Sequence, residues 1–116
     1  MAIQIQQNLT ATPNPTTLPK RITFQQTLVS DQAAEPIKVV YSLAPAHDVW
    51  FEDASGQRTK AIHRTDTISQ APKVCRDQIT LLRGPGQGPM AMVQVNQTVT
   101  DSEGVPLPDV CTLQLK

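Results

Sequence analysis

The sequence predicts an all-β protein, an antiparallel β-sandwich of roughly seven to eight short strands. Short runs of alternating apolar and polar residues recur along its 116 residues, as in strands that bury one face. Turn residues separate these runs, and the ten prolines lie largely in the breaks. No run repeats its apolar residues with the 3.6-residue period of a helix. The length suits one continuous core, so we expect residues 1–116 to form a single domain.

The first predicted strand ends at a proline corner. Ile3 and Ile5 alternate with glutamines, as in an edge strand. The strand must stop at Pro13, because proline has no N–H for the sheet ladder. The next strand, residues 21–28, has apolar side chains in alternation around Phe24.

This opening resembles a known family. A threonine-rich strand, an Asn-Pro corner and a Thr-Phe-containing strand, at residues 9–15 and 21–28, also occur in the first third of bacterial and phage immunoglobulin-like domains. The resemblance implies that residues 1–116 form one immunoglobulin-like sandwich. It also implies a binding or structural module, not an enzyme.

The remaining strands follow at regular spacing. Ser55-Gly56 and residues 101–104 are predicted tight turns, and residues 84–88 form a glycine-rich loop. The strands are expected at residues 37–43, 49–51, 58–67, 76–82, 90–100 and 111–115. Their inward faces predict one core cluster of Phe24, Val39, Tyr41, Ile79, Val93, Val95 and Leu113.

Two cysteines leave two alternatives open. Cys75 and Cys111 are both in phase with apolar neighbours, which predicts that their Cα atoms lie within about 7 Å, the reach of a disulfide. A bridge would stabilise the fold by roughly 3 to 4 kcal/mol in the chain-entropy model. The alternative is a pair of buried free thiols acting as small apolar side chains.

The charge balance argues against several partner classes. Ten basic and ten acidic side chains cancel, so we expect no nucleic-acid partner. No apolar run approaches the roughly 18 residues of a membrane span, and residues 1–7 lack the pattern of an export signal. Residues 58–83 nevertheless carry a net charge of +4. This region is either a solvated sheet face or a docking face for an acidic protein.

Candidate partner-binding residues come from three segments. The amino-terminal strand has no charge before Pro13, so its edge is poorly protected against pairing. The basic region and the glycine loop are the other two segments. The candidates are Ile3, Ile5, Arg58, Lys60, Arg64, Gly84, Gly86 and Gly88.

No reaction chemistry is predicted. The histidines and cysteines lack the local spacing of a zinc site, and no serine lies in a G-x-S-x-G elbow. The loop at residues 84–88 has no Gly-Lys-Ser/Thr ending and precedes a strand pattern, unlike a phosphate loop. We therefore predict no catalytic residue, metal site or cofactor.

The expected function is that of a non-enzymatic structural or interaction module. The first setting is a phage virion, as a decoration, cement or tail-associated protein. Its partner would be itself or a larger particle such as a capsid or tail. One alternative is a secreted or cell-surface bacterial adhesion domain. Another is a small-ligand or carbohydrate-binding sandwich that uses Trp50, Phe51 and residues 84–88.

Overall fold

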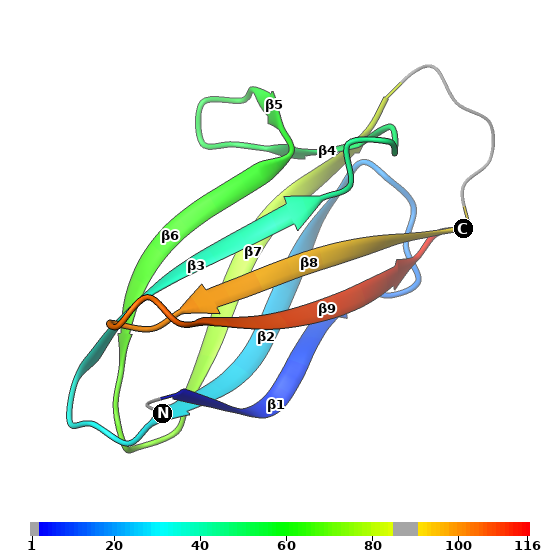
Figure 1. The fold of residues 1–116 in the computed structure, drawn as a ribbon. Helices are drawn as coiled ribbons and strands as arrows, with labels where there is room; N and C mark the ends of the chain where they lie inside the picture. Colours follow the sequence, from blue (N-terminus) through cyan, green and yellow to red (C-terminus); the bar gives the residue numbers. More distant parts are fainter. Residues whose placement is uncertain (1–2, 85–90) are drawn as a thin grey trace.

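The computed structural model describes residues 3–84 and 91–116. These residues form nine strands and no helix (Figure 1). The strands are β1 (Ile3–Thr12), β2 (Lys20–Ser30), β3 (Glu35–Leu43), β4 (Val49–Glu52), β5 (Arg58–Thr59), β6 (Ala61–Ile68), β7 (Lys73–Arg83), β8 (Met92–Thr100) and β9 (Pro106–Gln114).

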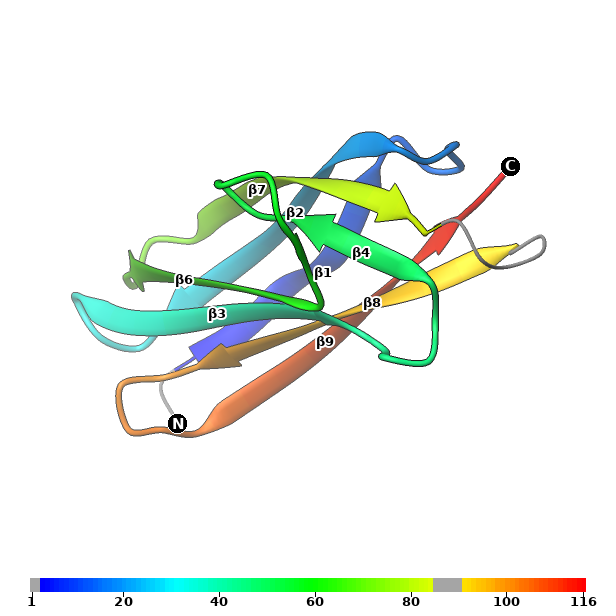
Figure 2. The same ribbon diagram turned by 90° about the horizontal axis from the view of Figure 1, so that it is seen from above.

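The strands form two antiparallel sheets that pack face to face (Figures 1 and 2). The five-stranded sheet has the order β1-β2-β7-β4-β5, and the four-stranded sheet has the order β6-β3-β8-β9. The predicted all-β antiparallel fold is therefore confirmed. The two sheets leave four edge strands: β1, β5, β6 and β9.

The predicted strand at residues 58–67 is divided between the two sheets. β5 pairs with β4 in the first sheet, and β6 pairs with β3 in the second. Lys60 lies at the crossing, where its Nζ donates to the carbonyl oxygens of Val49 (2.7 Å) and His47 (2.5 Å). The same ammonium group lies 4.1 Å from the centre of the Trp50 ring. The sequence has no proline or glycine between residues 58 and 67, so it gave no sign of the change of sheet.

The last strand begins earlier than expected. It starts at Pro106, whereas the prediction placed it at residues 111–115. Proline is tolerated in an edge strand where its missing N–H would face away from the ladder.

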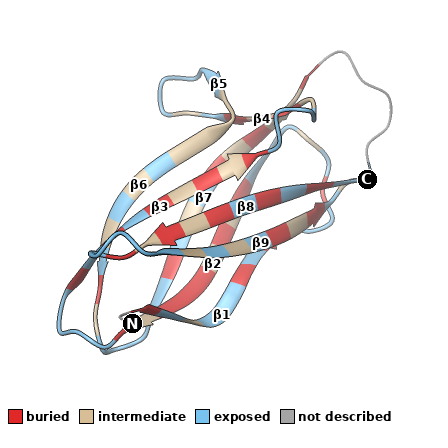
Figure 3. Cartoon of the chain, in the orientation of Figure 1, coloured by how far each residue is buried: buried red, intermediate tan, exposed pale blue. Residues whose placement is uncertain are grey.

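One apolar core fills the space between the sheets. Buried and exposed positions alternate along most strands (Figure 3). Phe24 and Tyr41 are 0% and 2% exposed, and their ring centroids lie 5.3 Å apart. The predicted cluster is confirmed in full, with Val39, Ile79, Val93, Val95 and Leu113 also in this core.

Both cysteines are buried free thiols, which is the second of the two alternatives left open by the sequence. Cys75 lies opposite Gln26 within the first sheet, and Cys111 lies opposite Val95 within the second. β7 occupies the centre of its sheet, whereas β9 is an edge strand of the other. Alternation in phase with apolar neighbours correctly predicted that both cysteine side chains face the core. It could not predict that they lie on strands of different sheets. Burial raises the pKa of both thiols.

Two of the predicted turns have the expected chemistry. Gly56 and Gly104 both have φ of +84°, a conformation that favours glycine. Asp53 and Asp101 begin these turns, and each accepts hydrogen bonds from two backbone N–H groups of its own turn through Oδ1. The aspartates therefore hold the hairpins closed.

We predict that Phe24→Ala lowers the free energy of unfolding by about 3 to 5 kcal/mol, because it removes a fully enclosed ring. Urea denaturation measures this loss. Val110→Ala, at a side chain that is 48% exposed, is the control and should change stability by less than about 0.5 kcal/mol. Equal effects of the two changes would contradict the assignment of Phe24 to the core.

Candidate interaction surface

The backbone groups at the outer edge of β9 can be identified from one hydrogen bond. Leu115 N–H donates to the Ala91 carbonyl oxygen beside β8, at 2.8 Å. Backbone groups alternate in direction along a strand. The N–H and C=O groups of odd-numbered residues of β9 therefore point toward β8, and those of even-numbered residues point outward. Pro106 and Pro108 are therefore outward-facing and offer no donor. Val110 is also outward-facing, and its N–H is taken by Asp109 Oδ1 at 2.8 Å.

Asn14 closes the remainder of this edge. Its Nδ2 donates to the Thr112 carbonyl oxygen (3.0 Å), and its Oδ1 accepts the N–H of Gln114 (2.8 Å). Thr16 N–H donates to the Gln114 carbonyl oxygen at 2.9 Å. The proline corner seen in the sequence therefore lies against the end of β9. Most outward-facing backbone groups of β9 are either missing or already bonded.

Asp109 joins the two sheets on the same side of the molecule. Its Oδ2 accepts the Leu9 N–H of β1 at 2.8 Å and the Gln26 Nε2–H of β2 at 3.1 Å. β1 is also irregular near this point, because its register against β2 shifts between Gln7 and Thr10. Bulges and bonded N–H groups are features that protect a sheet edge. We call the β9 edge together with Leu9 of β1 the closed flank.

The edge of β6 is different. Leu43 N–H donates to the Lys60 carbonyl oxygen at 2.9 Å, so even-numbered residues of β6 face β3 and odd-numbered ones face outward. Only the ends are capped. The Thr59 hydroxyl bonds both the N–H and the carbonyl oxygen of Ala61, and Asp66 Oδ1 accepts the Thr67 N–H at 2.7 Å.

The centre of the β6 edge is unpaired within the described part of the chain. The outward N–H and C=O groups of His63 and Thr65 have no hydrogen-bond partner there. Both side chains are exposed. β6 is the outermost strand of its sheet (Figure 1).

A second edge on the same side also lacks a pairing strand among the described residues. Gly84 N–H donates to the Asp48 carbonyl oxygen, so even-numbered residues of β7 face β4. β4 pairs only with the carboxyl-terminal end of β7, from Thr80 to Arg83. The backbone groups of Val74, Arg76 and Gln78 consequently face outward. We call the β6 edge and residues 73–79 of β7 together the open flank.

Ion pairs connect the two edges of the open flank. Arg64 of β6 lies 2.9 Å from Asp66 and 2.5 Å from Asp77 of β7. Lys73 of β7 lies 2.7 Å from the second oxygen of Asp66. Asp77 also accepts the Tyr41 hydroxyl hydrogen bond at 2.5 Å. These contacts bridge the two sheets where no strand pairing exists.

Burial and pairing act together on the titration of this cluster. Burial raises the pKa of Tyr41, and its hydrogen bond to Asp77 raises it further. Burial alone would lower the pKa of Arg64, but Asp66 and Asp77 outweigh it and the pKa is raised. Burial alone would raise the pKa of Asp66, but Lys73, the Thr67 N–H and Arg64 outweigh it and the pKa is lowered.

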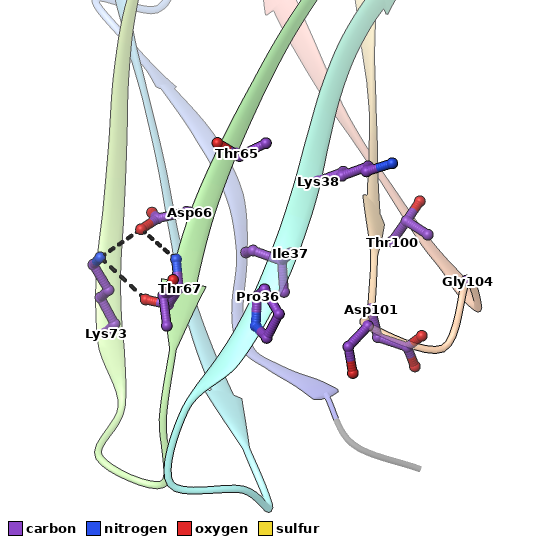
Figure 4. A pocket seen from close by; sticks show the side chains of 11 residues that line it. Pro36, Ile37, Lys38, Thr65, Asp66, Thr67, Lys73, Thr100, Asp101 and Gly104 are labelled. Atoms are coloured by element: carbon purple, nitrogen blue, oxygen red, sulfur yellow. Dashed lines mark hydrogen bonds and ion pairs between the residues drawn. The ribbon is translucent and has the colours of Figure 1, made fainter.

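A groove of about 730 Å³ adjoins the β6 edge (Figure 4). Lys38 and Thr65 line it from the outer faces of β3 and β6, and Thr100 lines it from β8. Ser102 also lines it, and its N–H (2.9 Å) and its hydroxyl both donate to the carboxylate of Glu35. These hydrogen bonds hold the pKa of Glu35 below its ordinary value. The groove therefore lies directly beside the unpaired backbone groups of β6.

The isoleucines predicted for partner binding point inward. Ile3 is 2% exposed, and Ile5 is partly buried against the core. The strand turns its apolar face to the core and its glutamines to solvent, and partner binding through this strand stays a prediction. The strand pairs with β2 along one side and is an edge strand of its sheet on the other.

The basic candidates are mostly occupied by intramolecular contacts. Lys60 holds the carbonyl oxygens at the β5–β6 crossing, and Arg64 is paired with two aspartates. Arg58 is exposed on β5. A Cβ on Gly84 would lie 1.9 Å from the Asp48 carboxylate, so a larger residue there would require the Asp48 side chain to move. Gly86 and Gly88 lie outside the described residues.

The carbohydrate alternative loses one of its aromatic residues. Phe51 is 0% exposed and belongs to the core. Trp50 donates its Nε1–H to Asp48 at 3.1 Å, and Lys60 covers its ring. Within the described residues, no group of three or more His, Cys, Asp or Glu side chains could hold a metal ion. No helix in this part of the chain has the length and apolarity to cross a membrane.

Comparisons with known proteins show a shared fold. No protein-family model matches the chain, and no curated protein sequence matches it. The alkylpurine DNA glycosylase AlkC of Pseudomonas fluorescens, solved with abasic-site DNA, is similar to 99% of this chain with a TM-score of 0.57 and 18% identity. A FixG-related protein from Vibrio parahaemolyticus matches the whole chain with a TM-score of 0.56 and 14% identity. Spo0M, a sporulation control protein of Bacillus subtilis, also matches the whole chain, with a TM-score of 0.55 and 10% identity.

The similar region makes up different shares of these proteins. It covers 30% of the glycosylase chain, 98% of the FixG-related chain and 50% of the Spo0M chain. The same sandwich therefore occurs both as a part of longer chains and as nearly a whole solved chain.

We predict that Asp66→Asn destabilises the protein at neutral pH and that the difference from wild type shrinks in acid. The pKa of Asp66 is lowered in the folded state, so its charge stabilises the fold above the unfolded-state pKa of about 3.9. This contribution is lost as the pH falls through the lower, folded-state pKa. Urea denaturation at a series of pH values measures it.

Asp31→Asn is the control, because Asp31 is exposed in the turn between β2 and β3. Its difference from wild type should stay small and change little with pH. An Asp66→Asn difference that is independent of pH would contradict the ion-pair account of the open flank.

Proposed function

We propose that the chain is a non-enzymatic immunoglobulin-like module that binds a protein through its open flank. The observation that carries this proposal is the contrast between its two sides. Asp109, Asn14 and two prolines close most of the β9 edge, and Asp109 also bonds the Leu9 N–H of β1, whereas His63 and Thr65 retain outward backbone groups. An edge of this kind can accept an extended segment as an additional strand, with backbone hydrogen bonds supplying the affinity.

The strand order supports the immunoglobulin-like part of the proposal. In such domains the A, B and E strands lie in one sheet, and the C′, C, F and G strands can lie in the other. β1-β2-β7 and β6-β3-β8-β9 correspond to these two sets. The additional β4 and β5 lie beyond β7.

The state of the ionisable groups favours binding over catalysis. The Tyr41 hydroxyl donates to Asp77, and its pKa is raised, which opposes use as a base at neutral pH. Arg64 and Asp66 form ion pairs with each other and with Asp77 and Lys73 across the sheets. These groups contribute to the cohesion of the open flank.

The setting proposed is a phage virion, where the module would be a decoration, cement or tail-associated protein. Its resemblance to phage and bacterial immunoglobulin-like domains supports this choice. The fold also occurs as half or less of the longer glycosylase and Spo0M chains, as expected of a module. A secreted or cell-surface bacterial adhesion domain is the second candidate, since the same resemblance supports it.

Fractionation of the organism that produces the chain tests this proposal. Particles, cell envelopes and the soluble fraction are separated and probed with an antibody raised against the chain. We expect the chain in the particle fraction, and expect Thr65→Pro, which removes the central outward N–H of β6, to reduce that association. Val110→Pro on the already closed β9 edge is the matched control and should leave it unchanged.

Recovery in the envelope fraction would overturn the virion setting in favour of the adhesion domain. Recovery only in the soluble fraction, without an associated protein, would overturn the proposal that the chain is an interaction module.

A further inference from the structure

We propose that the protein which adds to the β6 edge is a second copy of this chain, paired antiparallel with Thr65 opposite Thr65 of the copy. This inference rests on the proposed use of the open flank and names its partner. The two copies would be related by a twofold axis, so each presents the same residues to the other. The two four-stranded sheets would become one continuous eight-stranded sheet.

The direction of the backbone groups restricts the possible registers. Only the backbone N–H and C=O groups of odd-numbered β6 residues point outward. Hydrogen-bonded pairs must therefore join an odd-numbered residue of one copy to an odd-numbered residue of the other. Three registers centred on the edge meet this condition. They place Thr65 opposite Thr65, His63 opposite Thr65, or His63 opposite His63.

Side-chain charge separates these registers. With Thr65 opposite Thr65, Arg64 lies directly opposite Asp66 of the copy, and Asp66 opposite its Arg64. With His63 opposite Thr65, the two Arg64 side chains lie opposite each other, which is unfavourable for like charges. With His63 opposite His63, Arg64 faces only Ile62. The first register alone places opposite charges opposite each other, so that the Arg64–Asp66 ion pair within each copy extends to the other copy.

The exposed side chains and the overall charge also favour self-pairing. Thr65 meets Thr65 on the outer face, and threonine pairs across strands are stabilising. In the paired strands, the Thr67 N–H would no longer donate to Asp66 and would donate to the carbonyl oxygen of His63 in the copy. The chain has a formal net charge of zero at pH 7, so two copies approach without net repulsion.

The neighbouring β7 edge is less suitable for a second copy. An added strand there would be limited by β4, which already pairs with β7 from Thr80 onward. A symmetric pair centred on Arg76 would also place two guanidinium groups opposite each other. β6 has no further strand beyond it in its sheet.

Cysteine cross-linking tests both the partner and the register. Hydrogen-bonded residues directly opposite each other have Cα atoms about 5.5 Å apart, which suits a disulfide. Under mild oxidation, Thr65→Cys should therefore form a covalent dimer. His63→Cys should not, because residue 63 of one copy lies opposite residue 67 of the other. Arg76→Cys is the control on the β7 edge, and the native cysteines are buried.

Analytical ultracentrifugation without a cross-link provides an independent measurement. Wild type should dimerise reversibly, and Thr65→Pro should weaken the dissociation constant by at least about tenfold. Val110→Pro should dimerise like wild type. Circular dichroism confirms that each variant is folded before comparison.

The possible outcomes separate this inference from the proposed function. Cross-linking through His63→Cys or Arg76→Cys, or a wild type that stays monomeric at all concentrations, would overturn the dimer described here. A monomer recovered with particles would still support an interaction module whose edge binds another protein. A Thr65→Cys dimer with wild-type self-association lost in Thr65→Pro supports the inference.

Discussion

Every backbone N–H and C=O group at the edge of a sheet needs a hydrogen-bond partner or exposure to water, and this requirement organises the molecule. On the closed flank the chain supplies its own partners. Asn14 bonds the end of β9, and Asp109 bonds β1, β2 and its own edge. On the open flank, side chains cap only the ends of β6. The two sides of one sandwich therefore differ in their capacity to bind another strand.

A row of polar side chains crosses the core and connects the two flanks. Asp109, Gln97 and Tyr41 lie opposite one another on β9, β8 and β3. Tyr41 continues the row to Asp77, which pairs with Arg64 on the open flank. Tyr41 and Asp77 belong to opposite sheets, so the hydrogen bond between them helps to fix how the sheets sit on each other. Apolar packing around Phe24 supplies cohesion.

Local patterns predicted the strands well because alternation and proline act within a few residues. The inward positions of Phe24 and both predicted aspartate turns followed from such patterns. The open and closed flanks could not be predicted, because they depend on neighbours far apart in sequence: Asn14 bonds Gln114, 100 positions away. Two weaker signals were present. Pro106 and Pro108 alternate as an edge-blocking pair would, and Asp77 lies in phase with Ile79 and Leu81, which marks it as inward-facing.

The central claim is that the chain satisfies one flank internally and leaves the other unpaired. Amide hydrogen exchange followed by NMR, at a concentration where the protein is monomeric, tests it residue by residue. The account predicts slow exchange at the bonded edge amides of Leu9 and Gln114 and fast exchange at His63 and Thr65. Fast exchange at Leu9 and Gln114 together with protection at His63 and Thr65 would contradict it.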